Sequence, residues 1–286
     1  KRERFVGLVN KYVLLMKNET LPLQTPEDIR RIYDDIFYEE IKATDPEDLP
    51  DGKIFRKSDV GVYSPTGKKI HDGLYPESKI ISAMKKSLDF LNDSHYDILL
   101  RIAIFHYLFG YIHPFYDGNG RTSRFISSYT LSQNLNELIG YRISFTIKEN
   151  INKYYEAFKI CNHYHNRGDL TPFAEMFLGI VDVSMQQLYQ ALEERSEKLM
   201  HYINLIPQLP NAEDESMCKI YNYLVQAALF SNMGIYQKEL VYEMEMTYKT
   251  VRSRLKRIPE ELLITNKQGN RSFYLLDLKA VDELLK

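Results

Sequence analysis

Apolar residues recur at helical spacing through most of the first two hundred positions,. In residues 1–17 they fall on one face of a helix: Phe5, Leu8, Val9, Tyr12 and Leu15. Thr25 predicts another helix start, because it offers a cap and is followed by a proline and two acids,. Further helices are expected near residues 77–91, 96–112, 122–135, 150–162 and 171–199. The expected fold class is therefore mainly α.

Two segments of this part differ from an ordinary amphipathic pattern. In residues 54–74, IFRKSDVGVYSPTGKKIHDGL, β-prone residues flank a Ser-Pro-Thr-Gly turn, which predicts a short β-hairpin,. The helix expected at 96–112 is apolar on nearly every face, which is typical of a central helix enclosed by others,. Such a helix would be a rigid platform for whatever follows its C-terminal end.

The pattern changes after residue 205. Residues 205–214, LIPQLPNAED, carry two prolines and then acids, and we interpret 206–214 as a linker,. Beyond it, the periodicity predicts helices at 216–229, 236–244 and 247–258, then strands at 262–265 and 272–276. Three helices followed by a hairpin is the winged form of the helix-turn-helix. We therefore expect a helical domain at 1–205 and a winged-helix domain at 215–286.

Composition narrows the class of protein. The chain has 286 residues, of which 44% are hydrophobic and 27% charged, as in ordinary globular proteins,. A net charge of -2 gives no overall attraction to nucleic acid or acidic lipid,. Cys161 and Cys218 are too few for a disulfide framework,. With no apolar run long enough to span a bilayer, we expect a cytoplasmic protein without a membrane partner.

The stretch 112–124, IHPFYDGNGRTSR, concentrates groups that suit an anion. Gly118 and Gly120 leave room for a ligand to approach the main chain, where successive amides form an anion-binding concavity. Asn119 can donate its amide hydrogens to the same anion. Arg121 and Arg124 lie three apart on the first turn of the next helix, where both guanidiniums can meet phosphate oxygens,.

The same stretch also carries a base and a metal-seeking carboxylate. Asp117 beside phosphate oxygens would suit Mg²⁺. His113, at the end of the central helix, suits a general base for an attacking hydroxyl, while Phe115 is expected to be a buried anchor. Each feature alone is commonly structural, but their combination favours a site for phosphoryl or nucleotidyl transfer.

Other constellations have structural explanations that we prefer. His106 and His113 could imitate part of a metal-dependent hydrolase site, but His106 is expected to be a core residue,. Cys161, His163 and His165 could form a metal cluster, although the end of a helix explains them better,. No GxxxxGK[ST] motif is found in the sequence,.

The stretch HPFYDGNGRTSR matches the signature of the Fic (fido) family, His-x-Phe-x-Asp/Glu-Gly-Asn-Gly-Arg-x-x-Arg, at every specified position. The predicted hairpin resembles the flap of that family, and GDLTPFAEMFL at 168–178 resembles its closing segment. The resemblance covers about residues 56–180. It implies a helical fold and the transfer of AMP from ATP, with Mg²⁺, to a Ser, Thr or Tyr hydroxyl of a target protein.

The resemblance also implies a role for each residue of the motif. His113 would deprotonate the target hydroxyl, and Asp117 would bind the Mg²⁺ that bridges the α- and β-phosphates. Asn119 and the amides of residues 118–120 would hold these phosphates, and Arg121 and Arg124 the β- and γ-phosphates. The edge of the hairpin either pairs with an extended target segment or is only structural. Tyr154 and Tyr155 resemble the stretch near the adenine, or are core residues.

Several alternatives stay open at this point. We find no convincing copy of the family's inhibitory motif, Ser/Thr-x-x-x-Glu-Gly/Asn, so a separate antitoxin chain, lost upstream residues or no such control are all compatible with the sequence. A homodimer is also a possible assembly. The enzyme could use another nucleotide donor or remove AMP. A DNA-binding regulator could use the fold as a nucleotide sensor. Basic residues of the expected winged helix would contact either DNA or protein: Lys249, Arg252, Arg254, Lys256 and Arg257,.

Overall fold

The structure is a computed structural model that describes residues 9, 13, 20–63, 67 and 69–286. The helix expected over residues 1–17 and the turn expected at 64–67 therefore lie mostly outside the described residues. Contacts divide the chain into two compact units, 1–188 and 189–286, and each has its own hydrophobic core. Within the described ranges, no helix is long and apolar enough to cross a membrane.

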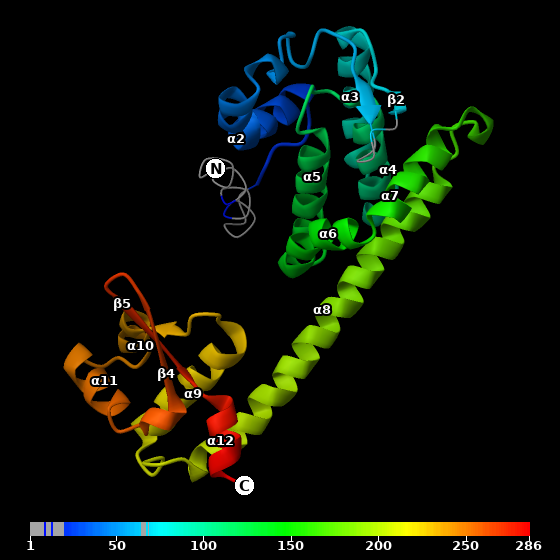
Figure 1. The fold of residues 1–286 in the computed structure, drawn as a ribbon. Coiled ribbons are helices and arrows are strands. Elements are labelled where there is room, and N and C mark those ends of the chain that lie inside the picture. Colours follow the sequence, from blue (N-terminus) through cyan, green and yellow to red (C-terminus); the bar gives the residue numbers. More distant parts are fainter. Residues whose placement is uncertain (1–8, 10–12, 14–19, 64–66, 68) are drawn as a thin grey trace. The chain divides into compact units, whose positions relative to one another are not determined.

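The first unit is mainly helical, as the sequence predicted. Its helices are α2 (Pro26–Thr44), α3 (Glu77–Leu91), α4 (Ile98–Ile112), α5 (Asn119–Asn134), α6 (Glu137–Glu149), α7 (Ile151–Asn162) and α8 (Thr171–Leu205) (Figure 1). The unbroken α8 continues into the second unit. The sequence pattern did not predict α6, which begins where the Asn136 side chain accepts the Leu138 N–H.

Helix α2 starts where its sequence predicted. The Thr25 hydroxyl accepts the Asp28 N–H at 3.3 Å, and the Asp28 carboxylate accepts the Thr25 N–H at 2.9 Å. This reciprocal pair satisfies two N–H groups that would otherwise lack partners at the helix start.

Helix α4 is the enclosed platform that its composition predicted. Ile102, Phe105 and Phe109 are buried, and α3 and α5 pack beside it (Figure 1). A methyl group added at Gly110 would lie 2.7 Å from the Phe158 ring, so glycine here lets α7 approach α4 closely.

The predicted hairpin is found in the segment between α2 and α3. Strand β1 (Gly61–Tyr63) pairs antiparallel with β2 (Lys69–Asp72). The chain before β1 is held by the Glu77 carboxylate, which accepts the N–H groups of Lys53, Ile54 and Phe55 at 3.1, 2.8 and 2.9 Å. Burial raises the pKa of Glu77, but these hydrogen bonds outweigh it and the net pKa is lowered,.

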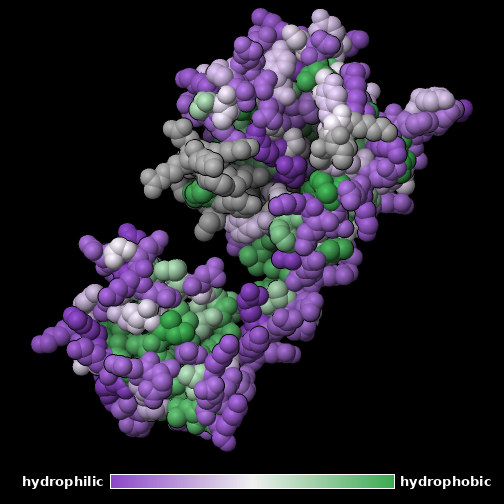
Figure 2. Space-filling model, in the orientation of Figure 1, coloured by the Kyte–Doolittle hydropathy of each residue, from purple (hydrophilic) through white to green (hydrophobic). Residues whose placement is uncertain are grey.

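The second unit has the helices α9 (Glu215–Phe230), α10 (Gln237–Glu243), α11 (Tyr248–Leu255) and α12 (Leu278–Leu284). Its strands β3 (Ile235–Tyr236), β4 (Leu263–Gln268) and β5 (Arg271–Leu276) form an antiparallel sheet in the order β3-β5-β4. Of these, α12 and β3 were not predicted. Figure 2 shows hydrophobic side chains gathered on the visible face of this unit. The winged-helix assignment and the domain boundaries stay predictions.

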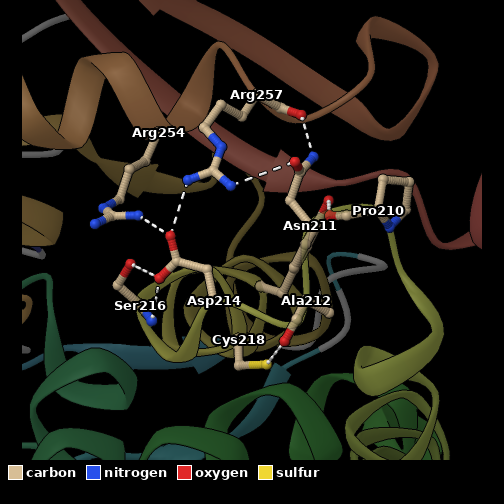
Figure 3. A network of polar contacts seen from close by, with 9 residues as sticks. Pro210, Asn211, Ala212, Asp214, Ser216, Cys218, Arg254 and Arg257 are labelled. Atoms are coloured by element: carbon tan, nitrogen blue, oxygen red, sulfur yellow. Dashed lines mark hydrogen bonds and ion pairs between the residues drawn. The ribbon is translucent and has the colours of Figure 1, made fainter.

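The segment 206–214, expected to be a linker, belongs to the second unit's core. Ile206 and Leu209 are buried there with Met217 and Leu224. At the end of this segment, Asp214 caps α9 through Ser216 and also forms ion pairs with Arg254 and Arg257, as Figure 3 shows. Ile206 and Leu209, each next to a proline, explain why this segment packs against the core.

Replacing Glu77 by Gln should destabilise the first unit. Three backbone N–H groups would lose a charged acceptor, which costs about 1–3 kcal/mol. Chemical denaturation of Glu77→Gln measures the loss. Asp89→Asn, an exposed carboxylate change on the same helix, is the control and should leave the unfolding midpoint unchanged. Equal midpoints for both variants would contradict the role of Glu77.

Replacing Asp214 by Ala should lower the denaturation midpoint of the second unit, because α9 loses its cap and two arginines lose their partner. Hydrogen bonds from Ser216 and Arg257 hold the pKa of Asp214 below its usual range. Its stabilising effect is therefore present above the unfolded-state pKa, which is about 3.9, and lost as the pH falls below it. Denaturation at pH 7 and pH 3 tests this, with Glu213→Ala as control. A midpoint difference that is no smaller at pH 3 would contradict it.

Candidate active site

His113 ends α4 in a left-handed backbone conformation, with φ 52° and ψ 63°. Its N–H donates to the Phe109 carbonyl at 3.0 Å, so the residue is the C-terminal cap of the helix,. Few residues other than glycine adopt positive φ, and such positions are often functional. The turn directs the chain from the central helix into the loop of residues 114–118.

Arg56 is fully buried and holds this turn in place. Its Nε donates to the His113 carbonyl at 2.9 Å, and its Nη2 donates to the Leu74 carbonyl at 2.8 Å. Its Nη1 donates to the Ser58 carbonyl. No carboxylate pairs with this guanidinium in the described ranges, and burial lowers its pKa. One side chain thus fixes both ends of the hairpin to the loop after α4.

The His113 imidazole is neutral near pH 7. Burial lowers its pKa to about 4, although the nearby Gly110 carbonyl opposes the shift. Its Nδ1 lies 3.4 Å from that carbonyl, which favours the tautomer with hydrogen on Nδ1,. Nε2 then carries the free lone pair, and the ring is neutral at pH 7.

The same imidazole borders a pocket between the hairpin, the starts of α5 and α7, and the end of α4. Its lining includes Gly110, Asn119, Gly120, Arg124 and Tyr155, with further residues from β1, β2 and α7: Val62, Tyr63, Ile70, His71, Ser123, Tyr154 and Phe158. The structure therefore brings His113, Asn119, Gly120 and Arg124 to one pocket. Tyr154 and Tyr155, predicted either near a ligand or in the core, also line it.

The loop before α5 is fixed from within. The Asn119 side chain accepts the Phe115 N–H at 2.9 Å and donates to the Phe115 carbonyl at 2.7 Å. The Phe115 ring, which is fully buried, stacks on Tyr33 with centroids 3.7 Å apart. Phe115 is thus the buried anchor that the sequence predicted. The side-chain oxygen of Asn119 and one of its amide hydrogens bond to Phe115 and fix the loop. Fewer amide hydrogens than expected can therefore be donated to an anion.

Gly118 turns this loop into α5. Its φ of 82° suits glycine, and an added Cβ would lie 3.0 Å from the Tyr33 ring. The helix begins at Asn119, so the N–H groups of its first residues have no acceptor in a preceding turn,. Together with the positive end of the helix dipole, they form an anion cradle beside Arg124.

The two arginines of the motif have different surroundings. Arg124 borders the pocket and has no ion pair with any described residue. Arg121 instead lies over the Phe37 ring and bridges two carboxylates, Glu40 at 2.6 Å and Asp117 at 2.7 Å. The expectation that both guanidiniums face one phosphate chain therefore differs from the arrangement found, because α2 supplies a competing carboxylate.

Asp117 fits a magnesium site in which the protein provides few of the ligands. Its side chain is 57% exposed, and Arg121 binds only Oδ2. Mg²⁺ keeps several waters and is commonly held by one or two carboxylates plus substrate phosphates. A site built wholly from protein does not arise, since no group of three or more His, Cys, Asp or Glu in the described part of the chain is placed to hold a metal.

Sequence reasoning missed a polar chain that ties the hairpin to the helices. His71 on β2 lies 3.2 Å from the Tyr111 carbonyl and 3.3 Å from the Asn162 amide, which in turn accepts the Tyr107 hydroxyl at 2.6 Å. Burial lowers the pKa of His71. Arg56, Glu40 and His71 lie outside any local motif, and only their partners distant in the sequence reveal them.

His106 is a core residue, as the sequence predicted. It is fully buried, with Nδ1 2.8 Å from the Ser127 hydroxyl and Nε2 2.8 Å from the Tyr154 hydroxyl. Burial lowers its pKa to about 3, so it stays neutral at pH 7. It supports Tyr154 in the pocket wall. Helix α7 ends at Asn162, which agrees with the structural explanation of Cys161 and His163.

The basic residues of α11 and of the turn that follows it are not all available to a partner. Arg254 and Arg257 pair with Asp214 (Figure 3). Lys249, Arg252 and Lys256 are exposed. The predicted contact with DNA or protein would therefore depend on these three residues more than on the other two.

Comparison with known proteins agrees with the geometry of the first unit. Residues 23–131 match the model of the Fic/DOC family. Protein adenylyltransferase Fic of Drosophila yakuba is 29% identical over 136 residues, which make up 46% of this chain and 24% of that protein. Protein adenylyltransferase fic-1 of Caenorhabditis elegans is 29% identical over 125 residues, 43% of this chain and 23% of that protein.

The chain thus spans about a quarter of the length of these curated relatives. Among solved structures, a Fic family protein from Desulfovibrio desulfuricans G20 matches with a TM-score of 0.57 and 18% identity. The match covers 96% of this chain and 75% of that one, and it shows a shared fold. Residues 23–131 of the first unit therefore match a Fic/DOC family domain.

Proposed function

We propose that the first unit transfers AMP from ATP to a hydroxyl side chain of a target protein. One observation carries this proposal: a neutral imidazole, the guanidinium of Arg124, which has no ion pair with a described residue, and the start of a helix border the same pocket. The named activity of the relatives supports it, although the chain spans only part of their length.

The proposed reaction uses His113 as the general base. Its Nε2 takes the proton of the target hydroxyl while the oxygen attacks the α-phosphorus. The new oxygen–phosphorus bond forms as the bond from the α-phosphorus to the pyrophosphate oxygen breaks, and pyrophosphate leaves. A base already unprotonated at pH 7 needs no prior loss of a proton, and general-base catalysis of this kind contributes about 10²–10⁴-fold.

The pocket would meet the charge of the phosphates with groups already in place. Arg124 and the free N–H groups of Asn119 and Gly120 supply positive potential beside the base,. A magnesium ion held by Asp117 would neutralise phosphate charge when bound. Such a preorganised cradle favours the transition state because it need not reorient during the reaction.

The first test is labelling with α-³²P-ATP and Mg²⁺ in a cell lysate. We expect label on a protein band with the wild type and a loss of about 10²–10⁴-fold with His113→Ala. His165→Ala, an exposed histidine of the same unit, is the matched control and should label normally. γ-³²P-ATP should give no label that depends on the added enzyme, because the terminal phosphate leaves with pyrophosphate. Equal labelling by wild type and His113→Ala would show that His113 is not the general base.

The second test is the pH dependence of this labelling. Because burial lowers the pKa of His113 to about 4, the base is unprotonated throughout the range from pH 6 to pH 8. At nucleotide concentrations well below saturation, where the rate follows the pKa of the free enzyme, it should change little there and fall only as the pH approaches 4. An NMR titration of the imidazole in the free enzyme measures the same pKa directly. A midpoint near the ordinary value of about 6.5 would contradict the lowered pKa and the flat rate profile.

A further inference from the structure

We propose that Glu40 on α2 is a positioning residue, which holds Arg121 against Asp117 and so raises the affinity of the site for a divalent cation. The two arginines of the motif then have different tasks. Arg124 faces the nucleotide, whereas Arg121 serves the carboxylate that binds the cation. This inference rests on the proposed function only for the role of Asp117.

The guanidinium of Arg121 is held from three sides. Its Nη1 lies 2.6 Å from Glu40 Oε1, and its Nη2 lies 2.7 Å from Asp117 Oδ2. Its central carbon lies 4.7 Å from the centre of the Phe37 ring, a cation–π distance,. A planar guanidinium with separate N–H groups can bridge two carboxylates in a fixed geometry. Arg121 is therefore built into the protein and is not free to follow a ligand.

One stripe of α2 provides this support. Tyr33, Phe37 and Glu40 lie four and three residues apart, so they share a face of the helix,. Tyr33 stacks on Phe115 of the motif loop. Phe37 and Glu40 both contact Arg121. The Glu40 side chain is only 10% exposed, so solvent screens its ion pair less than a surface pair,. All three residues of this stripe therefore contact residues of the motif.

Glu40 would affect cation binding in two ways, through the charge of Arg121 and through the orientation of Asp117. Arg121 alone would repel a divalent ion near Asp117, and the Glu40 carboxylate offsets that charge. Arg121 binds Oδ2 of Asp117, while Oδ1 has no hydrogen bond with any described residue. The bridge therefore presents one carboxylate oxygen in a fixed direction. Partners that orient a metal ligand typically change metal affinity by about 10–100-fold when mutated.

The test measures how much Mg²⁺ strengthens nucleotide binding to the full chain. Isothermal titration with α,β-methylene ATP, in Mg²⁺ and then in EDTA, gives the ratio of the two affinities. We expect Glu40→Gln to reduce this ratio about tenfold and to leave the affinity in EDTA nearly unchanged. Glu39→Gln, which removes the same charge at the neighbouring exposed position, should keep the wild-type ratio.

A double-mutant cycle shows whether the effect passes through Asp117. Asp117→Asn should abolish the gain from Mg²⁺, and adding Glu40→Gln to it should cause no further loss. Arg121→Lys offers a second variant, because a single ammonium cannot reproduce the two-pronged bridge and should also lower the ratio. Thermal denaturation of each variant confirms that the proteins remain folded.

Each outcome decides the question. A wild-type ratio in Glu40→Gln, or an additive loss in the double variant, would overturn the role of Glu40 even if nucleotide transfer is confirmed. A wild type that binds nucleotide without any gain from Mg²⁺ would also overturn it. Absence of nucleotide binding in both buffers would instead reject the proposed function, and with it the inference.

Discussion

The left-handed turn at His113 is the feature on which the rest of the site depends, and a buried arginine maintains it. Arg56 donates to the carbonyl of His113 and to the carbonyls at both ends of the hairpin. A buried guanidinium satisfied only by main-chain oxygens resists movement, because any shift would leave a buried charge without partners. The central helix, the hairpin and the motif loop are thereby held in one arrangement.

In that arrangement, residues that are neighbours in the motif lie on different sides of the loop. The turn places the His113 imidazole at a pocket where burial keeps it neutral, while Gly118 starts a helix whose first N–H groups face the same space. Arg124 joins them on one side of the loop. On the other side, Arg121 pairs with Glu40 of α2 and with Asp117 of the loop. The motif therefore lies between the pocket and a supporting surface on α2.

Local sequence predicted the elements that depend on local interactions. The cap at Thr25, the apolar α4, the anchor Phe115 and the core position of His106 all follow from spacing and composition. Helix α6 was missed. In the segment 206–214, whose prolines suggested a linker, Ile206 and Leu209 pack into a core.

The supporting contacts could not be predicted, because each joins residues far apart in sequence. Glu40 meets Arg121 across 81 positions, and Asn162 meets His71 across 91. Such pairs depend on how the helices pack, and no short motif encodes them.

A crystal of the full chain with α,β-methylene ATP and Mg²⁺ tests the central claim most directly. The account predicts the phosphates at the N-terminus of α5 and beside Arg124, with the α-phosphorus facing Nε2 of His113. Arg121 should still bridge Glu40 and Asp117. Phosphates bound elsewhere, or an imidazole turned away from the α-phosphorus, would contradict it.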